Sequence, residues 1–302
     1  LGASLVVNAR DARSGGGSVA PAENDARAQG AAPARGGVGP ARHLGPQGRV
    51  GQFVVHCTYS HSGPHDPIVH FGHAGRSHRH DFYGSDVVDA STTADDLLAG
   101  GTTCDKRADK AGYWHPTLYD HGEVVTPRSI SAYYRAAPGV DPSSVVTMPT
   151  GLALIAGDQT ATEPQEGDAA GWVCGSRTRL ADDPPECPGG APLHQVLTFQ
   201  DCWDGQNVDS RDHKSHVAYS VDGRCPASHA VHIPQITGSV AFPASGPGHE
   251  RTLASGNDHS AHGDFLNAWE PDGLLREIEQ CIHRDAVCDL ASNREEEALF
   301  TG

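Results

Sequence analysis

The stretch "FVVHC", residues 53–57, joins an aromatic residue to two β-branched ones, a composition that favours a pleated strand. Similar short runs, bounded by Gly, Pro, Asp or Asn, recur along the chain. They are SSVVTM (143–148), GLALIAG (151–157), QVLTFQ (195–200), HVAYSV (216–221), AVHIPQI (230–236) and GSVAF (238–242). The 36 glycines and 21 prolines indicate many turns between them. We therefore predict a mainly β fold of sandwich or jelly-roll type, with a few peripheral helices.

One segment near the end of the chain has helical periodicity. In PDGLLREIEQCIHRD (271–285), five apolar residues fall on one helical face, with Asp272 placed to cap its start. The residues of that face are Leu274, Leu275, Ile278, Cys281 and Ile282.

Composition divides the chain into three parts. Residues 1–50 are rich in Gly, Ala, Pro and Arg and cannot bury enough apolar area to offset chain entropy, which predicts a disordered leader. Its first residues, LGASLVVNARDA, resemble the end of a signal peptide. Residues 51–290 are expected to form a single globular domain, and residues 291–302 a solvated tail.

Charge narrows the classes of partner. Lys and Arg total 22 against 38 Asp and Glu, a net charge of −16. A field of that sign repels nucleic-acid backbones and anionic membranes but leaves neutral sugars and cations open. No apolar run reaches the roughly 20 residues of a membrane-spanning helix. We expect a monomer whose partner is a polysaccharide or cell-wall glycan.

Eight cysteines in an acidic, turn-rich chain indicate an oxidising compartment and a secreted, extracellular protein. None forms a C-x-x-C pair, so the signature of a zinc ribbon or a thioredoxin site is absent. Sequence proximity predicts four disulfides: Cys57–Cys104, Cys174–Cys187, Cys202–Cys225 and Cys281–Cys288. Buried free thiols in a cytosolic protein are the alternative.

Histidine is the distinctive residue type, with 19 in the chain. In SHRHDFYG (77–84), His78 and His80 would share one face of a strand and could bind one ion, with Asp81 on the other side. H-x-x-H occurs four times, twice with neighbouring carboxylates: Asp209 beside His213 and His216, and Asp264 beside His262. Imidazoles with carboxylates suit Zn, Cu or Mn. Surface or hydrogen-bonded histidines are the plain alternative.

Two further clusters are candidates for substrate binding. Trp203, Asp204 and Asn207 could stack on and bind a sugar, chelate calcium, or simply form an Asp/Asn-rich turn. Trp114 belongs to an aromatic segment that could line a cleft or pack in the core. Tyr134 and Arg135 could serve proton abstraction beside a uronic acid carboxylate, without any metal.

The chain resembles the DUF1996 family, a domain of unknown function found in secreted actinobacterial and fungal proteins. The resemblance rests on motifs in order between about Phe53 and Trp269, among them HCTYSHSGPHDPIVH, SHRHDFYG, YWHPTLYD, CWDGQNVDSRDHKSHVAY and HGDFLNAW. It implies an extracellular domain, in some members joined to carbohydrate-binding modules, and supplies no mechanism. The residues that it marks are His78, His80, Asp81, Asp204, Asn207, Asp209, His213, His216, His232, His262 and Asp264.

The leading hypothesis is a metal-dependent enzyme, a hydrolase, lyase or oxidase, acting on extracellular polysaccharide. In it His78, His80, His216 and His262 bind a divalent transition metal, while Asp81, Asp209, His213 and Asp264 are candidate catalytic groups. A metal-free lyase or hydrolase using His, Tyr134 and Arg135, and a non-catalytic glycan-binding module, remain open.

Overall fold

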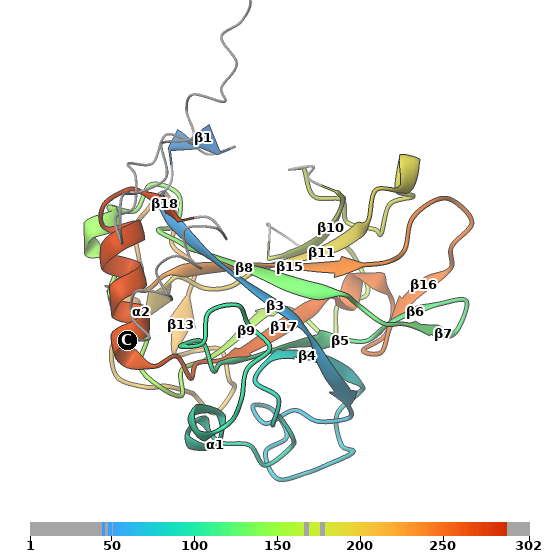
Figure 1. Cartoon of the computed structure of the whole chain (residues 1–302), viewed down its shortest axis with the longest axis horizontal. Helices are drawn as coiled ribbons and strands as arrows, with labels where there is room; N and C mark the ends of the chain where they lie inside the picture. Colours follow the sequence, from blue (N-terminus) through green and yellow to red (C-terminus); the bar gives the residue numbers. More distant parts are fainter. Residues whose placement is uncertain (1–43, 46–47, 50, 166–168, 176–178, 289–302) are drawn as a thin grey trace, which may run out of the picture.

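The computed structural model describes residues 44–45, 48–49, 51–165, 169–175 and 179–288 (Figure 1). The predicted leader, apart from a short pairing of β1 with β2, and the predicted tail lie outside these residues. The mainly β fold expected from the sequence is confirmed. The strands are β1 (Leu44–Gly45), β2 (Gly48–Arg49), β3 (Gln52–Gly63), β4 (His80–Gly84), β5 (Gly112–Pro116), β6 (Leu118–Asp120), β7 (Glu123–Val125), β8 (Ser129–Arg135), β9 (Ala153–Gly157), β10 (Ala170–Cys174), β11 (Leu193–Thr198), β12 (Cys202–Trp203), β13 (Val217–Ala218), β14 (Val231–His232), β15 (Gln235–Phe242), β16 (Arg251–Leu253), β17 (His262–Leu266) and β18 (Val287–Cys288).

Instead of two separate layers, the main β structure is one continuous sheet that curls until it nearly closes. Its strand order is β10-β11-β15-β8-β3-β4-β5-β17-β9, and β18 adds in parallel to the start of β3. The two ends approach each other: Leu197 of β11, the second strand from one end, packs against Gly263 of β17, the second strand from the other, and its Cδ1 lies 2.4 Å from where a Cβ on Gly263 would sit. Just after β11, Gln200 donates to the carbonyl of Ile155 in β9 at 2.9 Å.

Each face of the curled sheet carries its own apolar cluster. The larger one lies inside and includes Phe53, Trp172 and Phe242, all fully buried. The smaller one lies on the outer face of β4, β5, β17 and β9 and contains Phe82 and Trp114. The β3–β4 loop and α1 (Ala94–Ala99) cover this outer face (Figure 1). Because β4 has the inner cluster on one face and the covered outer cluster on the other, all five of its residues are buried.

Three local predictions need correction. Residues 143–148 form no strand, because Asp141 caps a 3-10 turn at Pro142–Ser144 and breaks the extended backbone. The helix near the chain end is α2 (Pro271–Glu277), which continues as a π-type turn over Ile278–Ile282. Its N-cap residue is Glu270 rather than Asp272, since Pro271 occupies the first helical position. Leu275, expected on the buried face, is 43% exposed.

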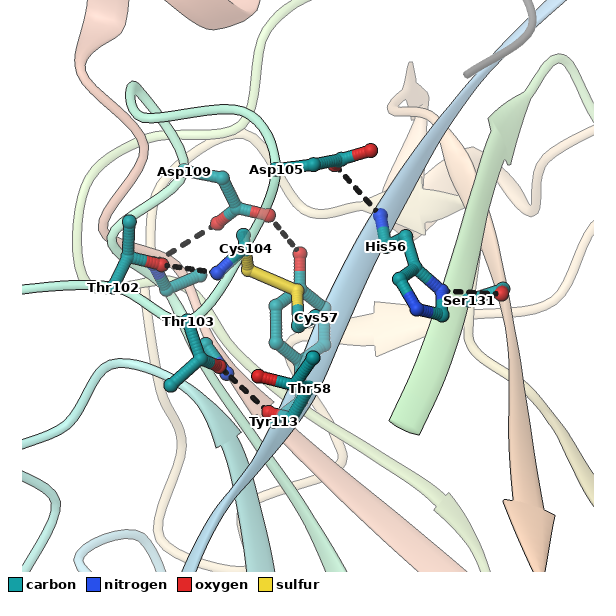
Figure 2. The surroundings of a disulfide bond; sticks show 12 residues. His56, Cys57, Thr58, Thr102, Thr103, Cys104, Asp105, Asp109, Tyr113 and Ser131 are labelled. Atoms are coloured by element: carbon teal, nitrogen blue, oxygen red, sulfur yellow. Dashed lines mark hydrogen bonds between the residues drawn. A yellow bond between two sulfur atoms is a disulfide. The ribbon is translucent and has the colours of Figure 1, made fainter. Parts of the chain in front are cut away.

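All four predicted disulfides are present. Figure 2 shows Cys57–Cys104, which joins β3 to the segment before β5, flanked by a hydrogen bond of 2.9 Å from the His56 amide to Asp105. Within the described residues, no helix is long and apolar enough to cross a membrane. Four disulfides are compatible with an extracellular protein.

A buried carboxyl lies close to this disulfide. Asp109 is fully buried and accepts hydrogen bonds from the Tyr113 hydroxyl at 2.6 Å and the Ala111 amide at 3.0 Å (Figure 2). Tyr113 in turn hydrogen-bonds Tyr134, whose hydroxyl accepts from the Trp269 indole at 3.1 Å. Burial raises the pKa of Asp109 to about 7, although both hydrogen bonds oppose the rise.

This raised pKa predicts a pH-dependent stability that Asp109→Asn removes. Between the unfolded pKa of 3.8 and about 7, folded Asp109 keeps a proton that the unfolded chain has lost, so its contribution falls as pH rises. From about pH 5 to about pH 7.5 this loss amounts to about 2 kcal/mol. Urea unfolding at both pH values should show wild type losing that much more stability than Asp109→Asn. Equal losses in the two proteins would contradict the assignment.

Candidate metal centre

Two histidines meet on the outer face of the sheet because their strands flank β5. His80 opens β4 and is the Cα partner of Pro116. On the other side of β5, Asp264 of β17 pairs with Trp114, and carrying this antiparallel register two residues further sets His262 beside Pro116. The ring centroids of His80 and His262 lie 5.8 Å apart.

A third imidazole joins them from the loop that precedes β4. The ring centroid of His78 lies 4.2 Å from that of His80 and 5.0 Å from that of His262. One ring nitrogen from each of the three lies within 4.8 Å of the others. Since zinc–nitrogen bonds are roughly 2.0–2.1 Å long, small rotations of these side chains would bring all three nitrogens onto one ion.

Backbone carbonyls fix the tautomers of two of these rings. His80 Nδ1 donates to the carbonyl of His65 at 2.9 Å, and His262 Nδ1 donates to the carbonyl of Ser260 at 2.8 Å. A carbonyl can only accept, so each Nδ1 carries the proton and each Nε2 keeps its lone pair. Among the described residues, neither Nε2 of His80 nor Nε2 of His78 has a hydrogen-bond partner, although both atoms are buried. This pattern, with one ring nitrogen anchored and the other bare, is typical of metal-ligating histidine.

The surroundings keep all three imidazoles neutral. Burial lowers the pKa of His78 to about 4 and that of His262 to about 3. The pKa of His80 lies well below its ordinary value for the same reason, and the nearby His78 and His262 lower it further. Neutral imidazole is the form that binds a metal.

Next to these histidines lie two buried carboxyls. Asp264 lies on the same face of β17 as His262. Its Oδ2 atom and Nε1 of the neighbouring Trp114 are both buried and have no hydrogen-bond partner among the described residues. Burial raises the pKa of Asp264 well above its ordinary value, and the charge of Asp66 adds to the rise. Asp66, in the β3–β4 loop, accepts from the amides of Ile68 and Val69 through Oδ1. Burial raises the pKa of Asp66 as well, against these two backbone hydrogen bonds.

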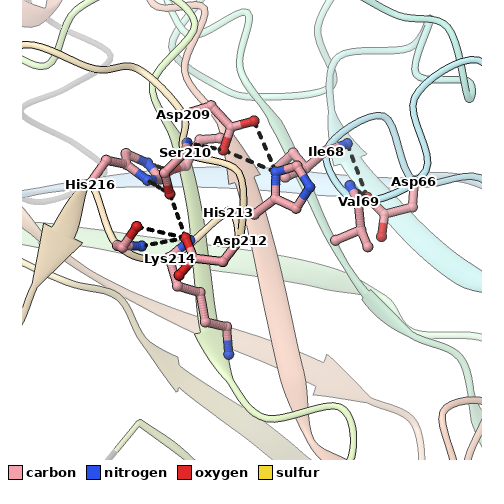
Figure 3. A network of polar contacts seen from close by, with 11 residues as sticks. Asp66, Ile68, Val69, Asp209, Ser210, Asp212, His213, Lys214 and His216 are labelled. Atoms are coloured by element: carbon pink, nitrogen blue, oxygen red, sulfur yellow. Dashed lines mark hydrogen bonds and ion pairs between the residues drawn. The ribbon is translucent and has the colours of Figure 1, made fainter.

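The loop between β12 and β13 lies beside the β3–β4 loop at Asp66 (Figure 3). His213 Nδ1 bonds both carboxylate oxygens of Asp209, at 3.0 and 2.9 Å, and Figure 3 shows its ring on the side facing Asp66. The charge of His213 lowers the pKa of Asp66 against the effect of burial, so the two groups are close. His216 donates through Nε2 to the carbonyl of Ala153 at 2.7 Å and contacts Ser210 through Nδ1. Both ring nitrogens of His216 therefore have protein partners, one of which attaches the loop to β9, and the structure does not bring His216 to the three imidazoles as the predicted metal ligand.

Asp81 lies on the opposite face of β4 from His80, as its position in the strand predicts. It accepts from Ser62 at 2.5 Å and from Thr117 at 2.9 Å through Oδ1. The structure does not bring it to the three imidazoles. Tyr134 and Arg135 are also separated, since they alternate along β8 and Tyr134 is fully buried in the inner cluster. A catalytic pair formed by these two residues therefore has no support in the geometry.

The predicted sugar or calcium cluster forms a self-contained turn. Asp204 accepts from the amides of Gln206 and Asn207 and from the side chain of Asn207. The indole of Trp203 donates to the carbonyl of Asn207 at 2.6 Å. Both Asp204 oxygens are thus hydrogen-bonded within the turn, which agrees with the Asp/Asn-rich turn expected as the alternative to a ligand site.

Sequence reasoning missed four contributors to the site: Asp66, Lys214, and the carbonyls of His65 and Ser260. No side-chain pattern marks a carbonyl. Gly63 is the one sequence feature that hints at the position of His65, because a Cβ at residue 63 would lie 2.5 Å from the His65 ring. Gly63 is also the Cα partner of His80, which places the His65 turn over that strand.

Comparison with known proteins gives one match. The family model described as a domain of unknown function, DUF1996, matches residues 66–269. This range contains all three histidines of the candidate metal centre. Neither the curated proteins nor the solved structures yield a match.

Proposed function

We propose that this protein, which belongs to the DUF1996 family, is a metal-dependent enzyme acting on an extracellular polysaccharide, with a metal bound by His78, His80 and His262. The observation that carries the proposal is the pair of anchored tautomers. His80 and His262 each donate Nδ1–H to a carbonyl and leave Nε2 free beside the third ring. Three neutral nitrogen ligands, two of them at the starts of strands, suit zinc or copper.

Three protein ligands leave a coordination position open, and a metal there supplies an activated water or an electrophile. The chain's own groups supply the rest. Asp264, buried and partnerless at Oδ2, is placed to hold or deliver a proton beside His262. Asp66 is held by two backbone amides and orients its carboxyl at the same face.

The polysaccharide substrate is proposed from the disulfides and the net charge of the chain. Four disulfides and a net charge of −16 fit an extracellular protein that handles sugars rather than nucleic acid. A non-catalytic glycan-binding module would use the same polar face without turning over its ligand. The metal-free lyase has less support, because Tyr134 lies in the core.

Activity assays separate these functions. Zinc- or copper-loaded protein is incubated with a panel of cell-wall and extracellular glycans, and new reducing ends, unsaturated products and oxidised products are measured. We expect Asp264→Asn to keep the metal but to lose about 100-fold or more in rate, as removal of an acid–base group does. Asp141→Asn, an exposed cap of a 3-10 turn, is the control with unchanged rate. Glycan binding without any product from loaded wild type would instead indicate a binding module.

A further inference from the structure

Lys214 brings a positive charge to the edge of the candidate metal centre. Its Nζ donates to the carbonyl of Gly157 at 2.8 Å, and Gly157, the last residue of β9, is the Cα partner of His262. The ammonium is therefore held one strand away from a proposed ligand. Figure 3 shows the Lys214 side chain extending away from the hydrogen bonds around Asp212 that hold its backbone.

The charge of Lys214 acts on the site. Besides burial, which dominates, it lowers the pKa of His262, and it lowers the pKa of Asp264 against the stronger effect of burial. In the part of the chain that the structure describes, Lys214 forms no ion pair with a carboxylate. One of its three N–H donors is used by Gly157, and Lys214 is exposed, so the other two are available to a ligand.

We propose that the centre binds an anionic oxygen of its substrate, a carboxylate or phosphate group on an acidic sugar chain, between the three imidazoles and the ammonium of Lys214. This inference rests on the proposed function and specifies its substrate class. The three neutral imidazoles leave a divalent ion its full charge, and Lys214 adds a second positive charge at the edge of the site, where the charges of Asp66 and Asp158 oppose them. In a chain of net charge −16, a divalent ion beside an ammonium group would mark this edge as the place where an anion binds.

The test follows anion binding at the metal itself. Protein loaded with Co²⁺ is titrated with inorganic phosphate, glucuronate and glucose, and binding is read from the visible absorption of the cobalt. A hydrogen bond to a charged group corresponds to roughly 1.5–3 kcal/mol, so Lys214→Met should weaken anion binding roughly 10- to 100-fold. Tighter binding of glucuronate would identify carboxylated sugars, and tighter binding of phosphate would identify phosphorylated ones.

Lys110→Met is the matched control, because Lys110 also donates to a glycine carbonyl, that of Gly100 at 3.1 Å, and should leave anion binding unchanged. Equal anion affinity in wild type and Lys214→Met, or binding of glucose alone, would overturn the inference while the cobalt spectrum still supports the metal centre. Absence of a cobalt spectrum in wild type would refute the metal centre and this inference with it.

Discussion

Replacing His80 with alanine is expected to abolish stoichiometric metal binding. Wild-type protein purified without an affinity tag or chelator, then reconstituted, should hold about one equivalent of zinc or copper per chain, and His80→Ala none. Loss of a group that merely orients a ligand costs about 10- to 100-fold in metal affinity, and loss of the ligand itself should cost more. Elemental analysis and a competition titration with a chelator measure the two quantities.

The physical reason lies in how His80 is held. Its ring is fully buried, its Nδ1 proton is committed to the carbonyl of His65, and its Nε2 has no protein partner. A buried nitrogen without a partner costs free energy in the metal-free protein, and a metal removes that cost. Metal at about 1,000 times its dissociation constant should therefore stabilise wild type by about 4 kcal/mol and leave the thermal midpoint of His80→Ala unchanged.

The control is another partly buried histidine in the same sheet. His194 of β11 contacts Ser239 through Nδ1 at 3.0 Å, and burial lowers its pKa as well. His194→Ala should keep the full equivalent of metal. Circular dichroism of the metal-free His80→Ala protein checks that it is folded. A folded His80→Ala protein that binds metal as wild type does would refute the three-histidine site.

Part of this site could be predicted from the sequence because it depends on neighbours in the chain. The spacing of His78 and His80 predicts a shared direction, and Asp81 lies on the opposite face as the strand period requires. The four disulfides also follow from proximity, since each joins cysteines adjacent in sequence order. These predictions use local geometry only.

The rest depends on the order of strands in the sheet, which no local pattern specifies. His262 joins His80 only because β5 lies between β4 and β17. The H-x-x-H spacing of His213 and His216 suggested that the two rings converge, but the structure directs them to different partners. His213 adopts a left-handed backbone conformation with φ 57°, whereas His216 turns inward to the carbonyl of Ala153. A metal-ligand spacing in sequence is thus a weak guide where the segment is a loop.

The second large effect is expected from the disulfide that encloses the segment carrying His78 and His80. Cys57 and Cys104 are 47 residues apart, and the chain between them carries His78, His80 and α1. On the chain-entropy account, closing a loop of that length stabilises the folded state by about 4 kcal/mol, against about 2 kcal/mol for the short Cys281–Cys288 loop. The Cys57→Ala/Cys104→Ala protein should therefore lose about 4 kcal/mol in unfolding free energy.

Urea unfolding of both cysteine-pair variants tests this ranking, with Cys281→Ala/Cys288→Ala as the matched control, separated by only 7 residues. Alanine suits both pairs because all four sulfurs are buried and a serine hydroxyl there would need a hydrogen-bond partner. Chain entropy requires the longer loop to cost more. If removal of the shorter loop costs as much as removal of the longer one, packing around the sulfurs rather than loop closure determines the stabilisation. The segment carrying His78 and His80 would then be held by its contacts on the outer face of the sheet.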